Sequence, residues 1–389
     1  MSFTETTHTS WFARLRNGVA AIFIGLLLVV VSIGLLFWNE GRAIETYRSL
    51  VEGASKVVDV DAARLDPAHE GQLVHVSGPI KPVGTPEDQV FGIAAPGAFQ
   101  VTRAVQMYQW VEKKSSHSEK KIGGGEETVT TYDYSKEWRG DVVDSSEFRQ
   151  QDQHQNPQRL VDPENFAVES AELGAFTLVG SQAAGLGTSK PIPLDAQAVT
   201  KFGQALGAAK AQPDAGGIYV GLNRNAPAVG DLRVSYQRVD LKEASFVAAQ
   251  KGTTLGDYRT SNGRGIFLSA AGIVSADTMF ADARSMNTVI TWLVRAGGLL
   301  LMFIGFAMMF SLLSIIADLI PFIGSIVGFG TSLVALVLTM VLGPIVIAIG
   351  WFAYRPLLAV GMIAGGLAIA YAIVRLRRKS AAPVAGVAG

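Results

Sequence analysis

Long stretches without a single charged residue alternate along the chain with segments of ordinary polarity. Four stretches contain no Asp, Glu, Lys or Arg, at 17–39, 296–317, 319–354 and 356–374. A helix that crosses the hydrocarbon core of a bilayer needs about 20 consecutive apolar residues. We therefore expect the first two stretches to form one transmembrane helix each, over 17–39 and 296–317.

The third stretch is too long for one crossing and short for two crossings joined by a turn. Asp318, Pro321 and Gly324 are typical of a turn near its start, so a third transmembrane helix is expected over 324–350. The fourth stretch predicts a further transmembrane helix over 357–374. These three C-terminal helices would form a bundle with very short loops.

Basic residues gather at the outer ends of the predicted helices. The N-terminal flank, 1–16, holds two arginines next to the first helix, and the tail, 375–389, begins with four basic residues among five. Short cytoplasmic flanks are rich in Lys and Arg. We therefore expect a multi-pass protein of the cytoplasmic (inner) membrane, with both termini cytoplasmic and residues 40–295 extracytoplasmic, in a periplasm or lumen.

The segment 40–295 has ordinary polarity, and its strand patterns are stronger than its helix patterns. Strands are predicted at 72–77, at 217–221, 231–238, 245–250 and 265–269, and in a long hairpin over 102–138 with a lysine-rich tip. Helices are predicted at 162–173 and 195–206 and from Ser275 onwards. The fold class that we predict is a multi-pass α-helical membrane protein with four spans. Its first two spans enclose a large β-dominated α+β domain, with a small barrel as one possibility.

Composition narrows the functional classes. The chain has 33 basic and 33 acidic residues, so no net charge attracts nucleic acid. It has no cysteine, which excludes thiolate catalysis and cysteine-ligated metals. The five histidines are not at metal-ligand spacing, and no nucleophile elbow or phosphate-binding loop is found. We predict no catalytic residue, no metal site and no cofactor.

Small residues recur inside the predicted transmembrane helices. Gly324 and Gly328 form one pair at four-residue spacing, and Gly361 and Gly365 form another. Such pairs let helix backbones approach closely in lipid. Packing within the bundle and self-association into a homo-oligomer both explain them.

A polar motif, Asn39-Glu40-Gly41-Arg42, stands where the first predicted helix leaves the lipid. Its charges can pair with one another or with lipid headgroups, and Gly41 permits a sharp exit from the helix. A simple interfacial stop and a docking role are both compatible with this motif.

Four large aromatic residues, Tyr108, Trp110, Tyr134 and Trp138, lie on the two arms of the predicted hairpin. Tyr and Trp have an apolar body and a polar tip, so together they form a broad amphipathic face. Packing between the strands is one interpretation, and a recognition face for a partner protein or lipid is the other.

Several motifs in a fixed order resemble the LUMA family, transmembrane protein 43. They are Asn39-Glu40-Gly41-Arg42-Ala43, Glu52-Gly53-Ala54-Ser55, Met107–Glu112, Tyr134-x-x-Glu137-Trp138-Arg139, Gly230–Ser235 and Tyr354-Arg355-Pro356-Leu357. The resemblance implies four membrane spans with one large domain between the first and the second. It supplies no catalytic residues.

The resemblance also implies a type of function. Eukaryotic members reside in the endoplasmic reticulum and inner nuclear membrane, where they are thought to self-associate and to organise envelope proteins, including lamins and emerin. The Ala/Gly-rich, cysteine-free composition of this chain is typical of a bacterial protein, so those partners are not carried over.

Our leading hypothesis is a non-enzymatic membrane scaffold that self-associates and binds envelope proteins or lipid headgroups through its extracytoplasmic domain. A membrane-tethered enzyme acting on envelope lipid or glycan is the first alternative, with Glu112, Asp133 and Glu137 as candidate acids. A channel or transporter is the second, although no predicted transmembrane helix contains a charge.

Overall fold

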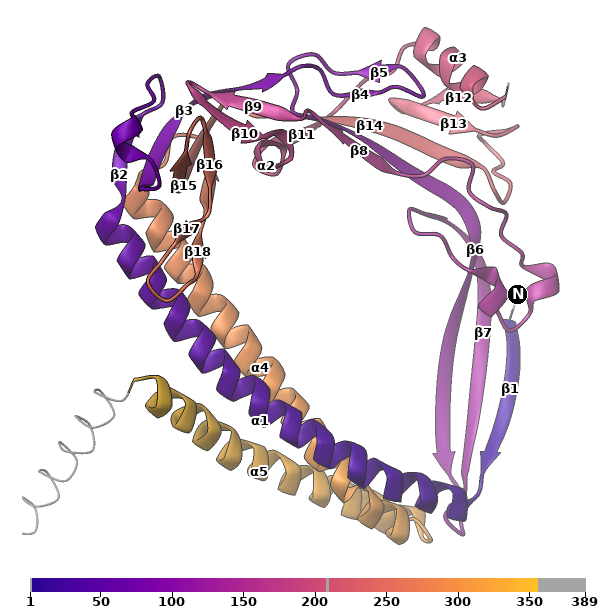
Figure 1. Ribbon diagram of the computed structural model, residues 1–389. Coiled ribbons are helices and arrows are strands. Elements are labelled where there is room, and N and C mark those ends of the chain that lie inside the picture. Colours follow the sequence, from indigo (N-terminus) through magenta and orange to yellow (C-terminus); the bar gives the residue numbers. More distant parts are fainter. Residues whose placement is uncertain (1, 208–209, 356–389) are drawn as a thin grey trace, which may run out of the picture. The chain divides into compact units, whose positions relative to one another are not determined.

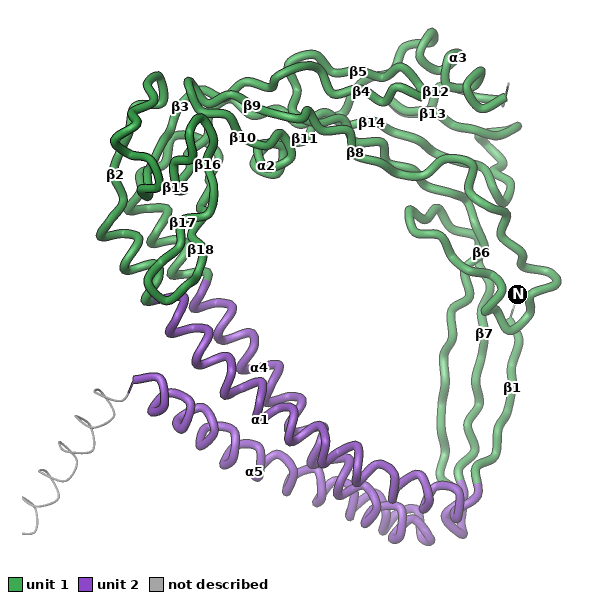
Figure 2. The backbone as a smooth tube through the Cα atoms, in the orientation of Figure 1, with its two compact units in different colours: residues 1–9, 48–120, 126–286 green, residues 10–47, 121–125, 287–389 purple. Residues whose placement is uncertain are grey.

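The computed structural model describes residues 2–207 and 210–355, and its chain divides into two compact units (Figure 2). We call residues 1–9, 48–120 and 126–286 the β unit. Residues 10–47, 121–125 and 287–389 are the helical unit. The long helices α1 (Trp11–Lys56) and α4 (Ala276–Ala317) contribute residues to both.

The first sheet of the β unit contains eight strands in antiparallel pairs (Figure 1). At its centre, β6 (Gln100–Lys120) pairs with β7 (Glu126–Arg139) on one side and with β14 (Leu232–Asp240) on the other. The remaining strands are β1 (Ser2–Thr9) on β7, β8 (Glu164–Ala167) on β6, β11 (Thr188–Pro191) and β13 (Gly217–Val220) on β14, and β12 (Ala211–Asp214) on β13. The predicted hairpin over 102–138 is therefore present and longer than expected.

The second sheet of the β unit closes on itself. Its ring runs through β3 (Leu73–Val83), β9 (Ser170–Leu173), β10 (Phe176–Val179), β16 (Thr254–Gly256) and β15 (Glu243–Lys251), and β15 pairs again with β3. Two more strands extend it, β2 (Val58–Asp61) on β3 and β19 (Leu268–Ala271) on β15. The small barrel that the sequence analysis allowed is thus formed. Two short hairpins, β4 (Glu87–Asp88) with β5 (Ile93–Ala94) and β17 (Tyr258–Arg259) with β18 (Gly265–Ile266), complete the strands.

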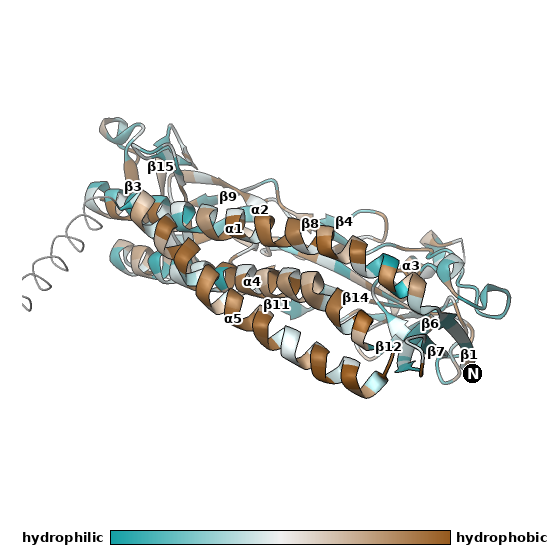
Figure 3. Cartoon of the chain, turned by 90° about the horizontal axis from the view of Figure 1, so that it is seen from below, coloured by the Kyte–Doolittle hydropathy of each residue, from teal (hydrophilic) through white to brown (hydrophobic). Residues whose placement is uncertain are grey.

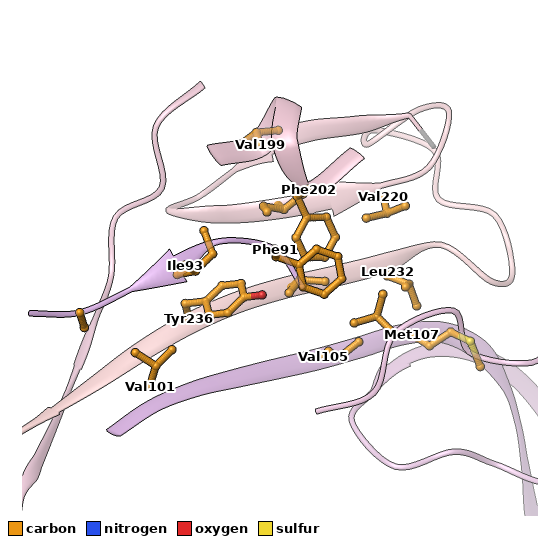
Figure 4. Close-up of a cluster of buried hydrophobic side chains, with 14 of the residues drawn as sticks. Phe91, Ile93, Val101, Val105, Met107, Val199, Phe202, Val220, Leu232 and Tyr236 are labelled. Carbon is orange, nitrogen blue, oxygen red and sulfur yellow. The ribbon is translucent and has the colours of Figure 1, made fainter. Parts of the chain in front are cut away.

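A hydrophobic core lies between the first sheet and the helix α3 (Ala196–Ala205) (Figure 4). Phe202 of α3 stacks on Phe91, with ring centroids 3.9 Å apart. The helix begins as predicted, because the Asp195 carboxylate accepts a hydrogen bond from the Ala198 amide. The barrel has its own core around Phe176 and Phe246, beside the short helix α2 (Gly180–Ala184).

The predicted helix over 162–173 is wrong. Strand β8 pairs with the start of β6, and β9 buries Ala171 and Leu173 on one face with a period of two. Asp162-Pro163 is a local signal for the start of a helix, but sheet pairing and burial override it.

Short 3₁₀ turns at Pro67–His69, Ser145–Glu147 and Gln151–Gln153 complete the elements of the β unit.

The lysine-rich part of the predicted hairpin tip is strand rather than loop, since β6 continues to Lys120. The remaining tip, 121–125, belongs to the helical unit. There the Arg14 guanidinium donates to the Gly124 carbonyl at 2.6 Å and to the buried Asp318 carboxylate at 2.5 Å. The Gly123 amide donates to the Leu319 carbonyl at 3.1 Å. Asp318 is a turn residue, as expected, and it also anchors this tip.

Strand β1 makes residues 2–9 part of the β unit, in register with residues 126–133. Two paired strands must lie on the same side of a membrane. This pairing argues against the expectation that residues 1–16 are cytoplasmic while 40–295 are extracytoplasmic, and that orientation stays a prediction. The bias of Lys and Arg toward cytoplasmic flanks depends only on residues next to a helix. Strand pairing depends on segments that are far apart in the chain.

The helical unit contains three helices that are long and apolar enough to cross a membrane, counted over the described residues (Figure 3). They are α1, α4 and α5 (Pro321–Tyr354), and they contain the predicted spans 17–39, 296–317 and 324–350. Both α1 and α4 continue well beyond the apolar run. The fourth predicted span, 357–374, with Gly361, Gly365 and the tail 375–389, lies outside the described residues.

Helix α1 packs on α4 through a seam of small residues at seven-residue spacing. Gly18, Gly25, Ser32 and Asn39 are all buried. A side chain at Gly25 would collide with the backbone of Gly305 on α4. Such a repeat keeps one face of a helix against its neighbour and allows close approach in lipid.

Candidate functional site

Polar side chains gather where the apolar runs of all three described membrane helices end. The runs stop before Glu40 on α1, begin after Arg295 on α4 and stop before Arg355 on α5. Glu40 contacts the position of Gly350 on α5 and binds Arg295. These ends therefore lie at one level, where helices that cross a bilayer meet the headgroup region.

Glu40 and Arg295 form a buried, bidentate ion pair. The Arg295 Nε donates to Oε1 of Glu40 at 2.7 Å, and Nη2 donates to Oε2 at 2.8 Å. The Glu40 residue is 1% exposed. Because both carboxylate oxygens are engaged by a planar guanidinium, the charge on each side chain is compensated by its partner. The absence of a side chain at Gly350 leaves room for Glu40.

Asn39 and Arg42 complete the polar cluster. The Asn39 amide donates to the Thr291 carbonyl at 3.1 Å, and its oxygen accepts from the Arg42 guanidinium at 3.1 and 3.3 Å. Arg42 also donates to the Asn287 side-chain oxygen and to the Thr291 hydroxyl, both at 3.0 Å. Asn287 donates to the Ala43 carbonyl at 2.9 Å. The predicted motif therefore links α1 to α4.

Gly41 has a different part from the one expected. The helix does not end there, since α1 continues to Lys56. A side chain at Gly41 would lie 2.5 Å from the Tyr354 ring of α5 and 2.8 Å from its hydroxyl. Gly41 is thus needed for close approach of α5, and the expected sharp exit from the helix at Gly41 is wrong. The interpretation of the motif as an interfacial stop stays a prediction.

Three polar residues of this cluster were missed by the sequence analysis. Asn287, Thr291 and Arg295 stand at four-residue spacing on α4, just before its apolar run. Residues with this spacing share one face of a helix. The sequence signal for these residues was a polar stripe on one helix face that leads into a transmembrane helix.

A cavity of about 180 Å³ opens beside the ion pair within the helical unit. Its wall includes two Arg and Trp pairs. The Arg295 guanidinium lies 4.9 Å from the centre of the Trp292 ring, and the Arg355 guanidinium lies 5.4 Å from that of Trp351. These distances are within the range of cation–π attraction.

The predicted aromatic face of the hairpin is largely occupied by contacts within the β unit. Tyr108 faces Trp138 across the strands, with ring centroids 5.2 Å apart. Tyr134 is buried beneath His154, whose ring stacks on it at 3.9 Å, while Trp110 contacts the same histidine edge-on at 4.6 Å. Cross-strand packing accounts for this geometry, and a recognition role for these residues stays a prediction.

Of the candidate acids of this hairpin, Glu112 and Glu137 are engaged in local bonds, whereas Asp133 is exposed. The Tyr134 hydroxyl donates to the Glu112 carboxylate at 2.5 Å, and the Arg149 amide donates to the same carboxylate at 2.6 Å. Burial and the bond to Glu112 raise the pKa of Tyr134 to about 12. Glu137 binds Lys113 at 2.5 Å, which lowers the pKa of the Glu137 carboxyl group.

A second buried polar network lies in the β unit and was not predicted. Arg103 binds Asp88, and it binds Glu164 at 2.8 Å. The Tyr236 hydroxyl donates to Asp88 at 2.7 Å. Burial, which is the larger cause, and this hydrogen bond both raise the pKa of Tyr236. The Arg103 guanidinium also lies 5.1 Å from the Phe91 ring centre. The network ties the β4 segment to β6 and β14.

No group of three or more His, Cys, Asp or Glu residues that could hold a metal ion occurs in the described part of the chain. His75 is hydrogen-bonded through both ring nitrogens. Its ring nitrogens lie 2.5 Å from Asp59 Oδ1 and 2.9 Å from the Val274 carbonyl oxygen.

Comparisons with known proteins agree on one family. The family model described as Transmembrane protein 43 matches residues 107–356. The chain is 31% identical to mouse Transmembrane protein 43 over 376 residues, which are 92% of this chain and 90% of that protein. It is 30% identical to the human protein, with 96% and 94% covered, and 30% identical to the Drosophila melanogaster homolog, with 78% of each covered. No solved structure matches the chain.

Proposed function

The chain belongs to the transmembrane protein 43 family, and we propose that it is a non-enzymatic scaffold that self-associates in the membrane. It is a membrane protein with a large β-rich domain and, among the residues that the structure describes, three candidate membrane helices. The names of its relatives state no enzymatic activity. In our proposal the helices hold the β unit at the membrane surface, where it binds other envelope proteins or lipid headgroups.

The closed polar cluster of the helical unit carries this proposal. Glu40 is held by Arg295, and Asn39 is held by the backbone of Thr291 and by Arg42. Polar residues that transport an ion or substrate face a water-filled path and change partners during the cycle. Here they bind each other across α1 and α4, which suits a fixed anchor better than a gate.

The glycines of α5 separate the contacts within a chain from those available to a second copy. A side chain at Gly324 would collide with Asp318, and one at Gly328 would press on Ser314, which supports a packing role for this pair within the helical unit. A side chain at Gly330 would have its Cβ more than 4 Å from every described residue, its chain neighbours and the nearby backbone of α5 aside. Successive residues of a helix are about 100° apart around its axis. Gly330 therefore lies on the opposite side of α5 from Thr339, which is buried. We propose that this outward face of α5 contacts the same face of a second copy.

Disulfide crosslinking tests self-association directly, because the natural chain has no cysteine. In native membranes under mild oxidation, Gly330→Cys should give a dimer that reductant reverses. Leu336→Cys is the matched control, since Leu336 is also exposed but lies on another side of α5. A dimer yield for Gly330→Cys no higher than for Leu336→Cys would remove the proposed interface. Only monomer after lysine-reactive crosslinking of the natural chain would remove self-association altogether.

The cytoplasmic membrane and the extracytoplasmic position of residues 40–295 are further parts of the proposal. The basic flanks of the first span and of the tail support this orientation. The pairing of β1 with β7 opposes it, because residues 2–9 would then lie across the membrane from their partner strand. Disulfide formation between cysteines placed at partner positions of β1 and β7 decides between the two.

A further inference from the structure

The cavity beside Glu40 and Arg295 has the position and the chemistry of a lipid-headgroup site. It lies at the level where the apolar runs of α1, α4 and α5 end. Trp292 in its wall is 64% exposed, and Trp residues favour this depth because their rings are amphipathic. Exposed apolar side chains, among them Leu300 and Ile304, continue from this level along the apolar run of α4. A lipid with its headgroup in the cavity would lay its acyl chains on such surfaces.

The charge of the cavity wall is positive. The charge of Arg295 is compensated by Glu40, whose two oxygens are both used. Arg355 forms no ion pair with any carboxylate of residues 2–207 and 210–355, and its guanidinium lies over the Trp351 ring. A guanidinium that has no acidic partner and borders a cavity at the headgroup level favours an anion there.

The available contacts fit a phosphate group and disfavour a cationic headgroup. A guanidinium offers phosphate oxygens two parallel donors. The cavity volume of about 180 Å³ is several times the roughly 30 Å³ occupied by one water molecule in the liquid, which leaves room for a phosphate with its ester oxygens but not for a whole lipid. The aromatic rings that would attract a choline cation are already faced by Arg295 and Arg355.

We propose that this cavity binds the phosphate of an anionic phospholipid, with Arg355 as the principal ligand and with Trp292 and Trp351 beside the headgroup. All residues of this site belong to the helical unit, whereas the scaffold proposal assigns partner binding to the β unit. Lipid binding here does not require self-association, so the two proposals succeed or fail separately.

Native mass spectrometry of the full-length protein in a mild detergent tests the site. The probes are phosphatidylglycerol, phosphatidylcholine of the same acyl chains, and inorganic phosphate. The natural chain should retain phosphatidylglycerol in preference to phosphatidylcholine. Arg355→Gln should lower the apparent affinity for phosphatidylglycerol about tenfold, the effect of losing one charge-assisted contact. Arg355→Lys should keep part of the affinity, because it keeps the charge and loses the paired donors.

Arg16→Gln is the control, because Arg16 is an exposed arginine at the opposite end of the apolar run of α1. It removes the same charge and should leave lipid retention unchanged. Equal retention by Arg355→Gln and the natural chain would overturn the proposal, and so would equal losses in Arg355→Gln and Arg16→Gln. Binding of inorganic phosphate without any preference for phosphatidylglycerol would overturn the lipid assignment. Thermal unfolding in lipid-free detergent checks that each variant is folded; if Arg355→Gln is not, the comparison of Arg355→Lys with Arg16→Gln decides.

Discussion

The Glu40 and Arg295 pair offers the sharpest test of how the helical unit is held together. Glu40→Gln keeps the size of the side chain and removes its charge, which leaves the Arg295 guanidinium without its acid. Breaking a buried ion pair costs about 3–5 kcal/mol, because the other charge stays buried without compensation. The Arg295 side chain is 19% exposed. Water or a lipid phosphate can therefore offset part of the loss, and we expect about 2–3 kcal/mol.

The assay is reversible unfolding of the full-length protein in detergent micelles by added sodium dodecyl sulfate, followed by far-UV circular dichroism. The double variant Glu40→Gln with Arg295→Gln has no unpaired charge and should be more stable than the sum of the single variants predicts, by about 1–3 kcal/mol. Glu147→Gln, a change at an exposed acid of the β unit, should have little effect. A loss below about 0.5 kcal/mol for Glu40→Gln, with no coupling in the double variant, would refute the reasoning.

Two further predictions concern the β unit. Thr4→Cys with Thr131→Cys should form an intramolecular disulfide in the purified protein and in membranes, since these residues are partners in β1 and β7. Thr4→Cys with Thr128→Cys, three residues out of register, should not, and failure of the first pair in membranes would favour the orientation based on the basic flanks. The pKa of Tyr134, raised from 10.0 to about 12 by burial and by its bond to Glu112, implies stability that is complete below pH 10 and is lost towards pH 12. Tyr134→Phe should reduce that alkaline loss in unfolding curves of the full chain, and an unchanged pH profile would contradict the assignment.

The sequence determined the elements whose cause is local. A run without charges that is long enough to cross a bilayer must be helical there, because lipid offers no partner to backbone polar groups. This placed α1, α4 and α5 in advance. The hairpin and the helix α3 were equally legible, since the residues that define each of them are neighbours in the chain.

Only the tertiary structure decided what depends on residues far apart in the sequence. Segment 164–173 carries the start signal of a helix, and pairing with β6 and β3 made it strand. Gly41 is placed for a turn, yet it accommodates Tyr354 of another helix. Glu40 and Arg295 are 255 positions apart and become partners only when α1 packs on α4. Local patterns record the preferences of single segments, whereas burial and charge compensation are properties of the packed chain, and the polar cluster and its cavity are built from those.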